Sequence, residues 1–198
     1  MKINEILYGQ LPKPSIDPSH KMTGLQLHGQ FDNHDIYIFN ALNGNTGFTI
    51  INDDQTYKAY VIVDTTKPEA GGLIFHEAYT NVNARKQGYM SMLILYIVRH
   101  HNTPLILEPS EIVTDDSRQM FYQLCKNNKV KIRNANTGLH MSIDELGELF
   151  MSIDDNDIKL IVESNGNGPS RKQYTEIFME TETTIIFGDS VIIREKYF

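Results

Sequence analysis

One stretch, residues 73–107, constrains the fold more than any other part of the chain. It consists of a strand-like run, a polar loop with a glycine, a segment that is apolar on nearly every helical face, and a second short apolar run. A helix that is hydrophobic all round belongs in the interior of a layered domain, so residues 90–101 should be buried between other elements. A strand–helix–strand order places its two strands in parallel. The sequence therefore predicts an α/β fold around a buried crossover helix.

Further strands and helices are expected on both sides of this unit. Residues 36–39, 47–51 and 57–63 are rich in β-branched and aromatic side chains and are separated by turn sequences, which predicts antiparallel strands. Downstream, residues 114–117 offer N-cap chemistry for a helix, and residues 130–132 form a further strand-like run. We expect a mixed, mostly antiparallel sheet with a parallel pair at its centre and helices on its faces.

The last part of the chain is expected to be an addition. We divide the sequence into a core with an N-terminal arm, residues 1–140, and a C-terminal extension packed on it, residues 141–198. Ser142 and Glu145 form a capping box that opens a helix. Apolar runs at 177–187 and 191–193 meet at a Gly-Asp turn and predict a hairpin. This β segment would either join subunits into a homo-oligomer or supply a wall of a binding site.

Charge and cysteine content narrow the function classes. The net charge is −7 at pH 7, which argues against a nucleic-acid or anionic-membrane binder, because those partners call for a basic face. A cationic partner such as an amine is compatible with this charge. Cys125 is the only cysteine, so the chain has no intramolecular disulfide and no cysteine-cluster zinc site. Its histidines have no metal-ligand spacing, so no metal is expected.

The sequence carries no apparent membrane or export signal. The first residues lack the apolar core of a signal peptide. The longest apolar run, residues 92–98, is far shorter than the span of about twenty residues that a bilayer requires. We therefore expect a soluble, cytoplasmic protein.

The segment from residue 79 to residue 90 is the candidate site. It leads from a strand through a polar loop onto the start of the buried helix, where unpaired backbone N–H groups and the helix dipole favour a phosphate. Gly88 would allow close backbone approach, and Arg85 and Lys86 add positive charge. The alternative is an ordinary strand-to-helix turn that happens to contain a glycine.

This segment resembles the pyrophosphate loop of the GNAT superfamily of N-acetyltransferases, which reads Gln/Arg-x-x-Gly-x-Gly/Ala. Arg85 and Gly88 match, whereas Met90 stands where the family has a small residue. A buried helix, a short strand and a helix bearing Phe121-Tyr122 follow in the family's order, so the resemblance covers about residues 47–133. Glu108 and Tyr122 are similar to the glutamate and tyrosine pair of the N-terminal-alanine acetyltransferases.

The resemblance implies a splayed central strand pair and direct acetyl transfer from acetyl-coenzyme A to an amine of a small molecule or protein. It implies Glu108 as general base, Glu77 as second choice, and Tyr122 as the acid that protonates the departing thiolate. A backbone N–H near Tyr79 or Thr80 would polarise the thioester carbonyl. The coenzyme would lie against Tyr79, Thr80, Val82, Arg85, Lys86, Gln87, Gly88, Tyr89 and Met90.

A second function class stays open. Each catalytic candidate has a structural alternative: Tyr122 as core packing, Glu108 as a solvated loop carboxylate, and Glu77 as a strand-face charge. GNAT enzymes place two helices between their first and second strands, but residues 24–63 favour strands and turns. The alternative is thus a catalytically inactive GNAT-like module with a structural or protein-interaction role.

Overall fold

The computed structural model describes residues 14–69, 72–100, 103–107, 115–151 and 158–166, together with the backbone of 186–187 and 190–191. The chain divides into two compact units, Met1–Asn167 and Gly168–Phe198. In the second unit the described residues are two short antiparallel strands, β9 (Ile186–Phe187) and β10 (Ser190–Val191). The remainder of the predicted hairpin, residues 177–185 and 192–193, lies outside the described residues.

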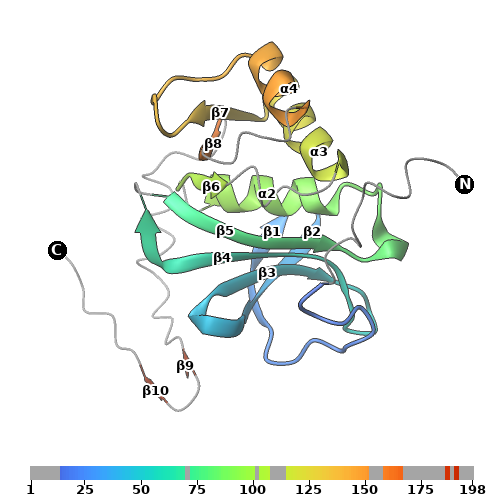
Figure 1. Cartoon of the computed structure of the whole chain (residues 1–198). Coiled ribbons are helices and arrows are strands. Elements are labelled where there is room, and N and C mark those ends of the chain that lie inside the picture. The colour runs from blue at the N-terminus through green and yellow to red at the C-terminus, as the bar shows by residue number, and fades with distance from the viewer. Residues whose placement is uncertain are drawn as a thin grey trace, which may run out of the picture. The chain divides into compact units, whose positions relative to one another are not determined.

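The first unit is built on a sheet whose described strands follow the order β1-β2-β3-β4-β5-β6-β8-β7 (Figure 1). Neighbouring strands run antiparallel except β5 and β6, which are parallel. The predicted fold class, a mixed and mostly antiparallel sheet with one central parallel pair, is confirmed. The strands are β1 Gln26–Phe31, β2 His34–Asn40, β3 Thr46–Ile51, β4 Tyr57–Glu69, β5 Gly72–Thr80, β6 Leu105–Leu107, β7 Val130–Asn134 and β8 Leu160–Ser164.

The described pairing between the parallel strands β5 and β6 is confined to the beginning of β5. β5 and β6 are in register at Leu73 with Leu105 and at Ile74 with Ile106. β5 then continues to Thr80, and a bulge between Phe75 and Glu77 shifts its register against β4. Within the described residues, no strand pairs with the β6-facing edge of β5 beyond Ile74. The described part of β6 therefore pairs only with the beginning of β5.

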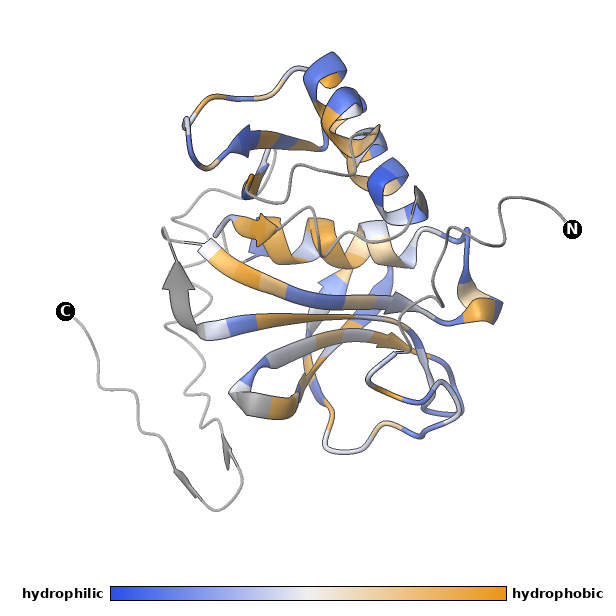
Figure 2. Ribbon diagram, viewed as in Figure 1, coloured by the Kyte–Doolittle hydropathy of each residue, from blue (hydrophilic) through white to orange (hydrophobic). Residues whose placement is uncertain are grey.

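The main core lies between one face of the sheet and three helices, α2 (Tyr89–His100), α3 (Asp115–Lys126) and α4 (Ile143–Met151). α2 is buried through Leu93, Ile94 and Ile97, and Figure 2 shows hydrophobic residues along this helix and β6. The predicted crossover helix thus occupies the interior. Its burial holds the preceding loop, which includes the one-turn helix η2 (Val82–Ala84), at the end of β5.

A smaller core occupies the opposite face of the sheet. It consists of Met22, Phe39, Tyr57, Tyr60 and Ile62, with Ile16 and Leu25 of the N-terminal arm packed against it. The Tyr57 hydroxyl donates to the Ile16 carbonyl over 3.0 Å, which fastens the arm to this face. Residues 14–25 therefore cover a sheet face on which the described part of the chain places no α-helix.

Two strands were not predicted. β1 joins β2 through Asp32 and Asn33, whose positive φ angles of 51° and 63° fit the tight hairpin turn that suits twisted strands. This hairpin confirms that no helical pair separates the first two described strands. β8 lies between β6 and β7, so residues 143–164, assigned from sequence to an extension, contribute a helix and an inner strand to the same unit as residues before 140.

A histidine pair connects β1 with α2. The His28 Nδ1 and the Tyr96 hydroxyl share a hydrogen bond of 2.7 Å, and the ring centroids of His28 and His100 lie 4.8 Å apart. Burial, with a smaller contribution from His100, lowers the pKa of His28 to about 4, and burial also lowers the pKa of His100. Both side chains are therefore neutral in the folded protein at neutral pH.

We expect folding stability to fall as the pH drops from about 6.5 to about 4. In that window the unfolded chain, with an ordinary histidine pKa of about 6.5, binds more protons than the folded chain. The loss from His28 should be about 1–2 kcal/mol, since solvent access to the ring screens part of the effect. Urea unfolding at pH 7.0 and pH 4.5 measures it. His28→Gln should flatten the dependence; a slope equal to that of the wild type would contradict the assignment.

Candidate functional site

The loop between β5 and α2 has a defined internal structure. The Asn81 side chain caps η2 by accepting a 3.2 Å hydrogen bond from the Asn83 N–H. The N–H groups of Ala84 and Arg85 donate to the carbonyls of Asn81 and Val82. The backbone N–H groups of Asn83, Ala84 and Arg85 are therefore satisfied within the loop.

The backbone N–H groups that immediately follow Arg85 find no hydrogen-bond acceptor among the described residues. Met92 N–H donates to the Gly88 carbonyl over 3.0 Å, which is the first hydrogen bond of α2. For the N–H groups of residues 86–91, the described part of the chain supplies no acceptor. Free donors at the positive end of a helix dipole are the usual setting of a phosphate or carboxylate.

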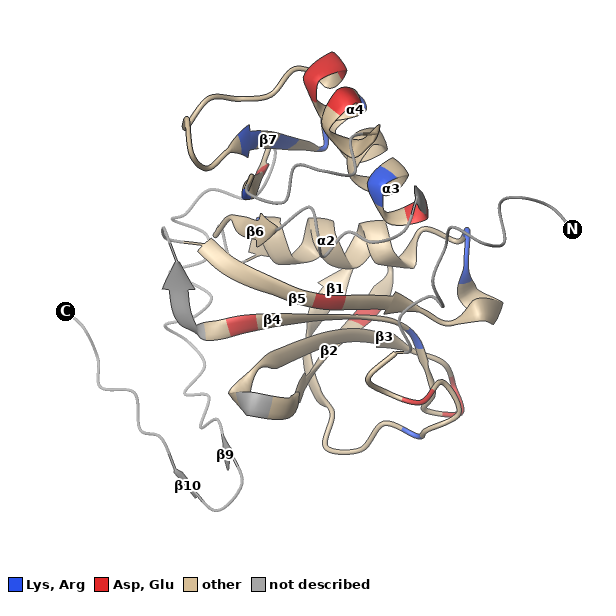
Figure 3. Cartoon of the chain, viewed as in Figure 1, with Lys and Arg blue, Asp and Glu red and all other residues tan. Residues whose placement is uncertain are grey.

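Gly88 lies at the centre of these donors. Its φ of +83° is a conformation that side-chain-bearing residues rarely adopt, and a Cβ placed there would have nothing within 4 Å. The space beside it is thus open. Arg85 and Lys86 are exposed next to it, and Figure 3 shows this basic stretch of the loop in blue. Met90 packs against the main core, so its long side chain does not fill this space.

The edge of β5 that faces away from β4 leads toward this loop, and no described strand pairs with it beyond Ile74. Asn81 N–H donates to the Lys58 carbonyl over 2.9 Å, and Tyr79 is paired with Tyr60. Since successive N–H groups of a strand point to opposite edges, those of Ala78 and Thr80 point away from β4, toward the edge of β5 on which β6 pairs. The alternation thus favours Thr80 over Tyr79 as the donor for a bound carbonyl. The Tyr79 ring packs against the smaller core.

Of the predicted catalytic side chains, the two that the structure describes lie on opposite faces of the sheet. Glu77 lies on the face of the smaller core, where its Oε1 accepts hydrogen bonds from the Tyr60 hydroxyl over 2.5 Å and the Ser15 N–H over 2.9 Å. Tyr122 is half-buried against the main core on the other face, and its ring is 3.7 Å from a Cβ built on Gly147 of α4. Glu108 lies outside the described residues.

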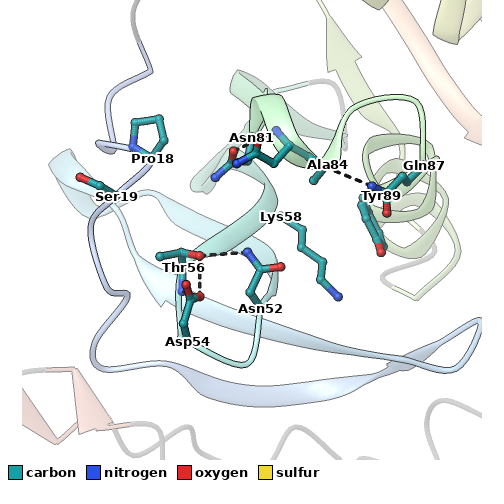
Figure 4. A pocket seen from close by; sticks show the side chains of 11 residues that line it. Pro18, Ser19, Asn52, Asp54, Thr56, Lys58, Asn81, Ala84, Gln87 and Tyr89 are labelled. Carbon is teal, nitrogen blue, oxygen red and sulfur yellow. Dashed lines mark hydrogen bonds between the residues drawn. The ribbon is translucent and has the colours of Figure 1, made fainter.

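A cavity that sequence reasoning missed adjoins the loop. It measures about 410 Å³, and Lys58 extends into it between Asn52 and Tyr89 (Figure 4). Lys58 is the only charged residue in the run 57–63, and this charge among apolar and aromatic side chains is the sequence signal that could have found the cavity. The lining residues come from the N-terminal arm, the β3–β4 hairpin and the loop before α2: Pro18, Ser19, Asn52, Asp54, Thr56, Lys58, Asn81, Asn83, Ala84, Gln87 and Tyr89.

Among the described residues, no group of three or more His, Cys, Asp or Glu side chains could hold a metal ion. In the described part of the chain, no helix has the length and apolar character needed to cross a membrane.

Comparison with known proteins finds matches among solved structures. No protein-family model and no curated protein sequence matches the chain. Among solved structures, an acetyltransferase of the GNAT family from Staphylococcus aureus Mu50 is similar, with 14% sequence identity and a TM-score of 0.36. The similarity covers 64% of this chain and 72% of that one.

Proposed function

We propose that this protein binds acetyl-coenzyme A and transfers the acetyl group to an amine. The observation that carries the proposal is the row of backbone N–H groups at residues 86–91 that find no acceptor among the described residues. They lie beside the edge of β5 with which no described strand pairs beyond Ile74. A ligand that has an anionic group and a strand-like arm fits both features at once. Coenzyme A combines a diphosphate with a pantetheine arm that contains two amides.

The diphosphate would bind at the start of α2. The free N–H groups around Gly88 donate to its oxygens, and the exposed side chains of Arg85 and Lys86 supply positive charge. The pantetheine amides would pair with the main chain of β5 from Ala78 to Thr80, in the manner of an added strand.

The proposed chemistry is one acyl transfer in which the thioester C–S bond breaks and a C–N bond forms. Thr80 N–H would stabilise negative charge on the carbonyl oxygen. Glu108 would accept the proton that the substrate ammonium must lose before attack, and Tyr122 would donate the proton that the departing thiolate takes up. The second proton, which the nitrogen loses once the C–N bond has formed, would return Tyr122 to its neutral form through solvent. Glu77 is the weaker candidate for the base, because its carboxylate is held by Tyr60 and Ser15 on the other face of the sheet.

A thermal-shift titration with acetyl-coenzyme A tests the binding. A ligand that binds only the folded state at about a hundred times its Kd adds about 2.7 kcal/mol of stability, which should raise Tm by about 5 °C or more. Desulfo-coenzyme A should give a similar shift, whereas pantetheine, which lacks the diphosphate, should give a much smaller one. Absence of any shift at millimolar acetyl-coenzyme A would remove the proposal.

A second function, a GNAT-like interaction module without catalysis, is favoured by one specific observation. Glu77 and Tyr122 lie against different cores on opposite faces of the sheet. The two functions differ in thiol release: the enzyme frees coenzyme A thiol from acetyl-coenzyme A in the presence of an accepted amine. Binding without thiol release across primary amines and peptide N-termini would favour the interaction module.

A further inference from the structure

The cavity beside the loop has the volume of a small-molecule site, and its lining is mainly polar. Its volume of about 410 Å³ is in the usual range for ligand pockets, and the side chains around it are mainly amides and hydroxyls. Tyr89 contributes an aromatic ring, which the His34 ring meets edge-on with 5.4 Å between centroids. The wall formed by Gln87 and Tyr89 is continuous with Gly88, which stands between them in the chain.

Lys58 is the charged group that the cavity leaves without a counter-ion. Its side chain is half-buried, its Nζ lies 5.2 Å from the centroid of the Tyr89 ring, and it forms no ion pair with the described residues. Asp54 also lines the cavity, but its carboxylate is engaged by the Thr56 N–H and hydroxyl and faces the charge of Lys21. A half-buried cation without a carboxylate partner favours an anionic ligand.

The amides in the cavity can serve a ligand that both donates and accepts hydrogen bonds. Asn52 donates to the Thr56 hydroxyl over 2.9 Å, and Gln87 donates to the Asn83 carbonyl over 3.2 Å. The side-chain oxygens of Asn52 and Gln87 accept no hydrogen bond from the described residues. A purine has donors and acceptors around its edge and a flat face that can lie against an aromatic ring, so it matches this lining.

We propose that the cavity binds the 3′-phosphorylated adenosine of coenzyme A, with the Lys58 ammonium on the 3′-phosphate. This inference rests on the proposed function, since it extends the same ligand from the start of α2 into the neighbouring cavity. The thioester arm follows β5 on its β6 side, and Lys58 lies on β4, on the other side of β5. The diphosphate at Gly88 joins the two ends, as it does in the coenzyme itself.

The test compares coenzyme A with 3′-dephospho-coenzyme A, which differs only in this phosphate. Kd values are measured by calorimetry for the wild type, Lys58→Met, Lys58→Arg and Lys21→Met. The wild type should bind coenzyme A about tenfold more tightly than the dephospho form, the factor that a hydrogen bond to a charged group supplies. Lys58→Met should lose this preference by weakening coenzyme A alone, and Lys58→Arg should keep most of it. Lys21→Met, a matched change of an exposed lysine outside the cavity, should behave as the wild type.

The outcomes separate this inference from the function on which it rests. If the wild type binds neither compound, the proposed function fails and this assignment falls with it. If both compounds bind but the wild type does not distinguish them, the cavity does not hold the 3′-phosphate. A Lys58→Met variant that weakens both compounds by the same factor would place Lys58 on a group they share, such as the diphosphate, and would also overturn the assignment.

Discussion

Replacing Gly88 with glutamate is expected to lower the affinity for coenzyme A by at least about a hundredfold, equivalent to about 2.7 kcal/mol. Two effects combine. The φ of +83° disfavours any residue with a side chain, so the loop must shift and its free N–H groups lose their common direction. The new carboxylate also enters the open space beside the diphosphate and repels it. Calorimetric titration with coenzyme A measures the loss.

Gly138→Glu is the matched control for this variant. Gly138 also has a positive φ, of 72°, and a Cβ built on it likewise meets nothing within 4 Å, but it lies in the turn after β7. Backbone strain and added charge are therefore similar in the two variants. Coenzyme affinity should be unchanged in Gly138→Glu. Equal affinity in Gly88→Glu and the wild type would show that the diphosphate binds elsewhere.

Replacing Gly47 with valine is expected to destabilise the fold by about 3 kcal/mol, which corresponds to a fall in Tm of about 6–12 °C. Gly47 and Phe39 are directly opposite on β3 and β2, and the Phe39 ring lies over the glycine where a Cβ would stand. Phe39 is itself buried in the smaller core, so its ring cannot swing away without disturbing Tyr60. Urea unfolding of the two proteins measures the difference in free energy.

The Phe39→Ala background tests this explanation. Once the ring is absent, valine at position 47 fills the space that it leaves, and its additional cost should fall below about 1 kcal/mol, as expected for coupled neighbours. If Gly47→Val costs the same free energy in both backgrounds, the contact with Phe39 does not explain the glycine.

The elements that could be predicted from sequence are those with a local signal. The apolar surface of α2 and the capping box of α4 each mark a helix without reference to the rest of the chain. β1 lacks such a signal because Gln26, His28 and Gln30 interrupt it, and its side chains find partners only when Tyr96 is brought near by the fold. β8 was missed because its short apolar run becomes a strand through long-range pairing with β6 and β7.

The candidate site likewise has one part with a local sequence signal and another part that only the fold brings near. The donors around Gly88 follow from one contiguous segment, so the sequence indicated them. Lys58 is distant in sequence from Tyr89 and joins the site only because β4 and β5 are paired. The orientation of Glu77 depends on the bulge after Phe75, which shifts the alternation of side chains along β5 and has no clear sequence signal.

The insertion of β8 between β6 and β7 has a consequence for synthesis. β7 precedes β8 in the chain, yet its hydrogen-bonding partner in the sheet is β8, which ends at Ser164. While the ribosome is still adding these residues, the nascent chain presents β6 and β7 as uncovered strand edges. Such edges invite pairing with other chains, so this half of the sheet should be the part that depends most on chaperones.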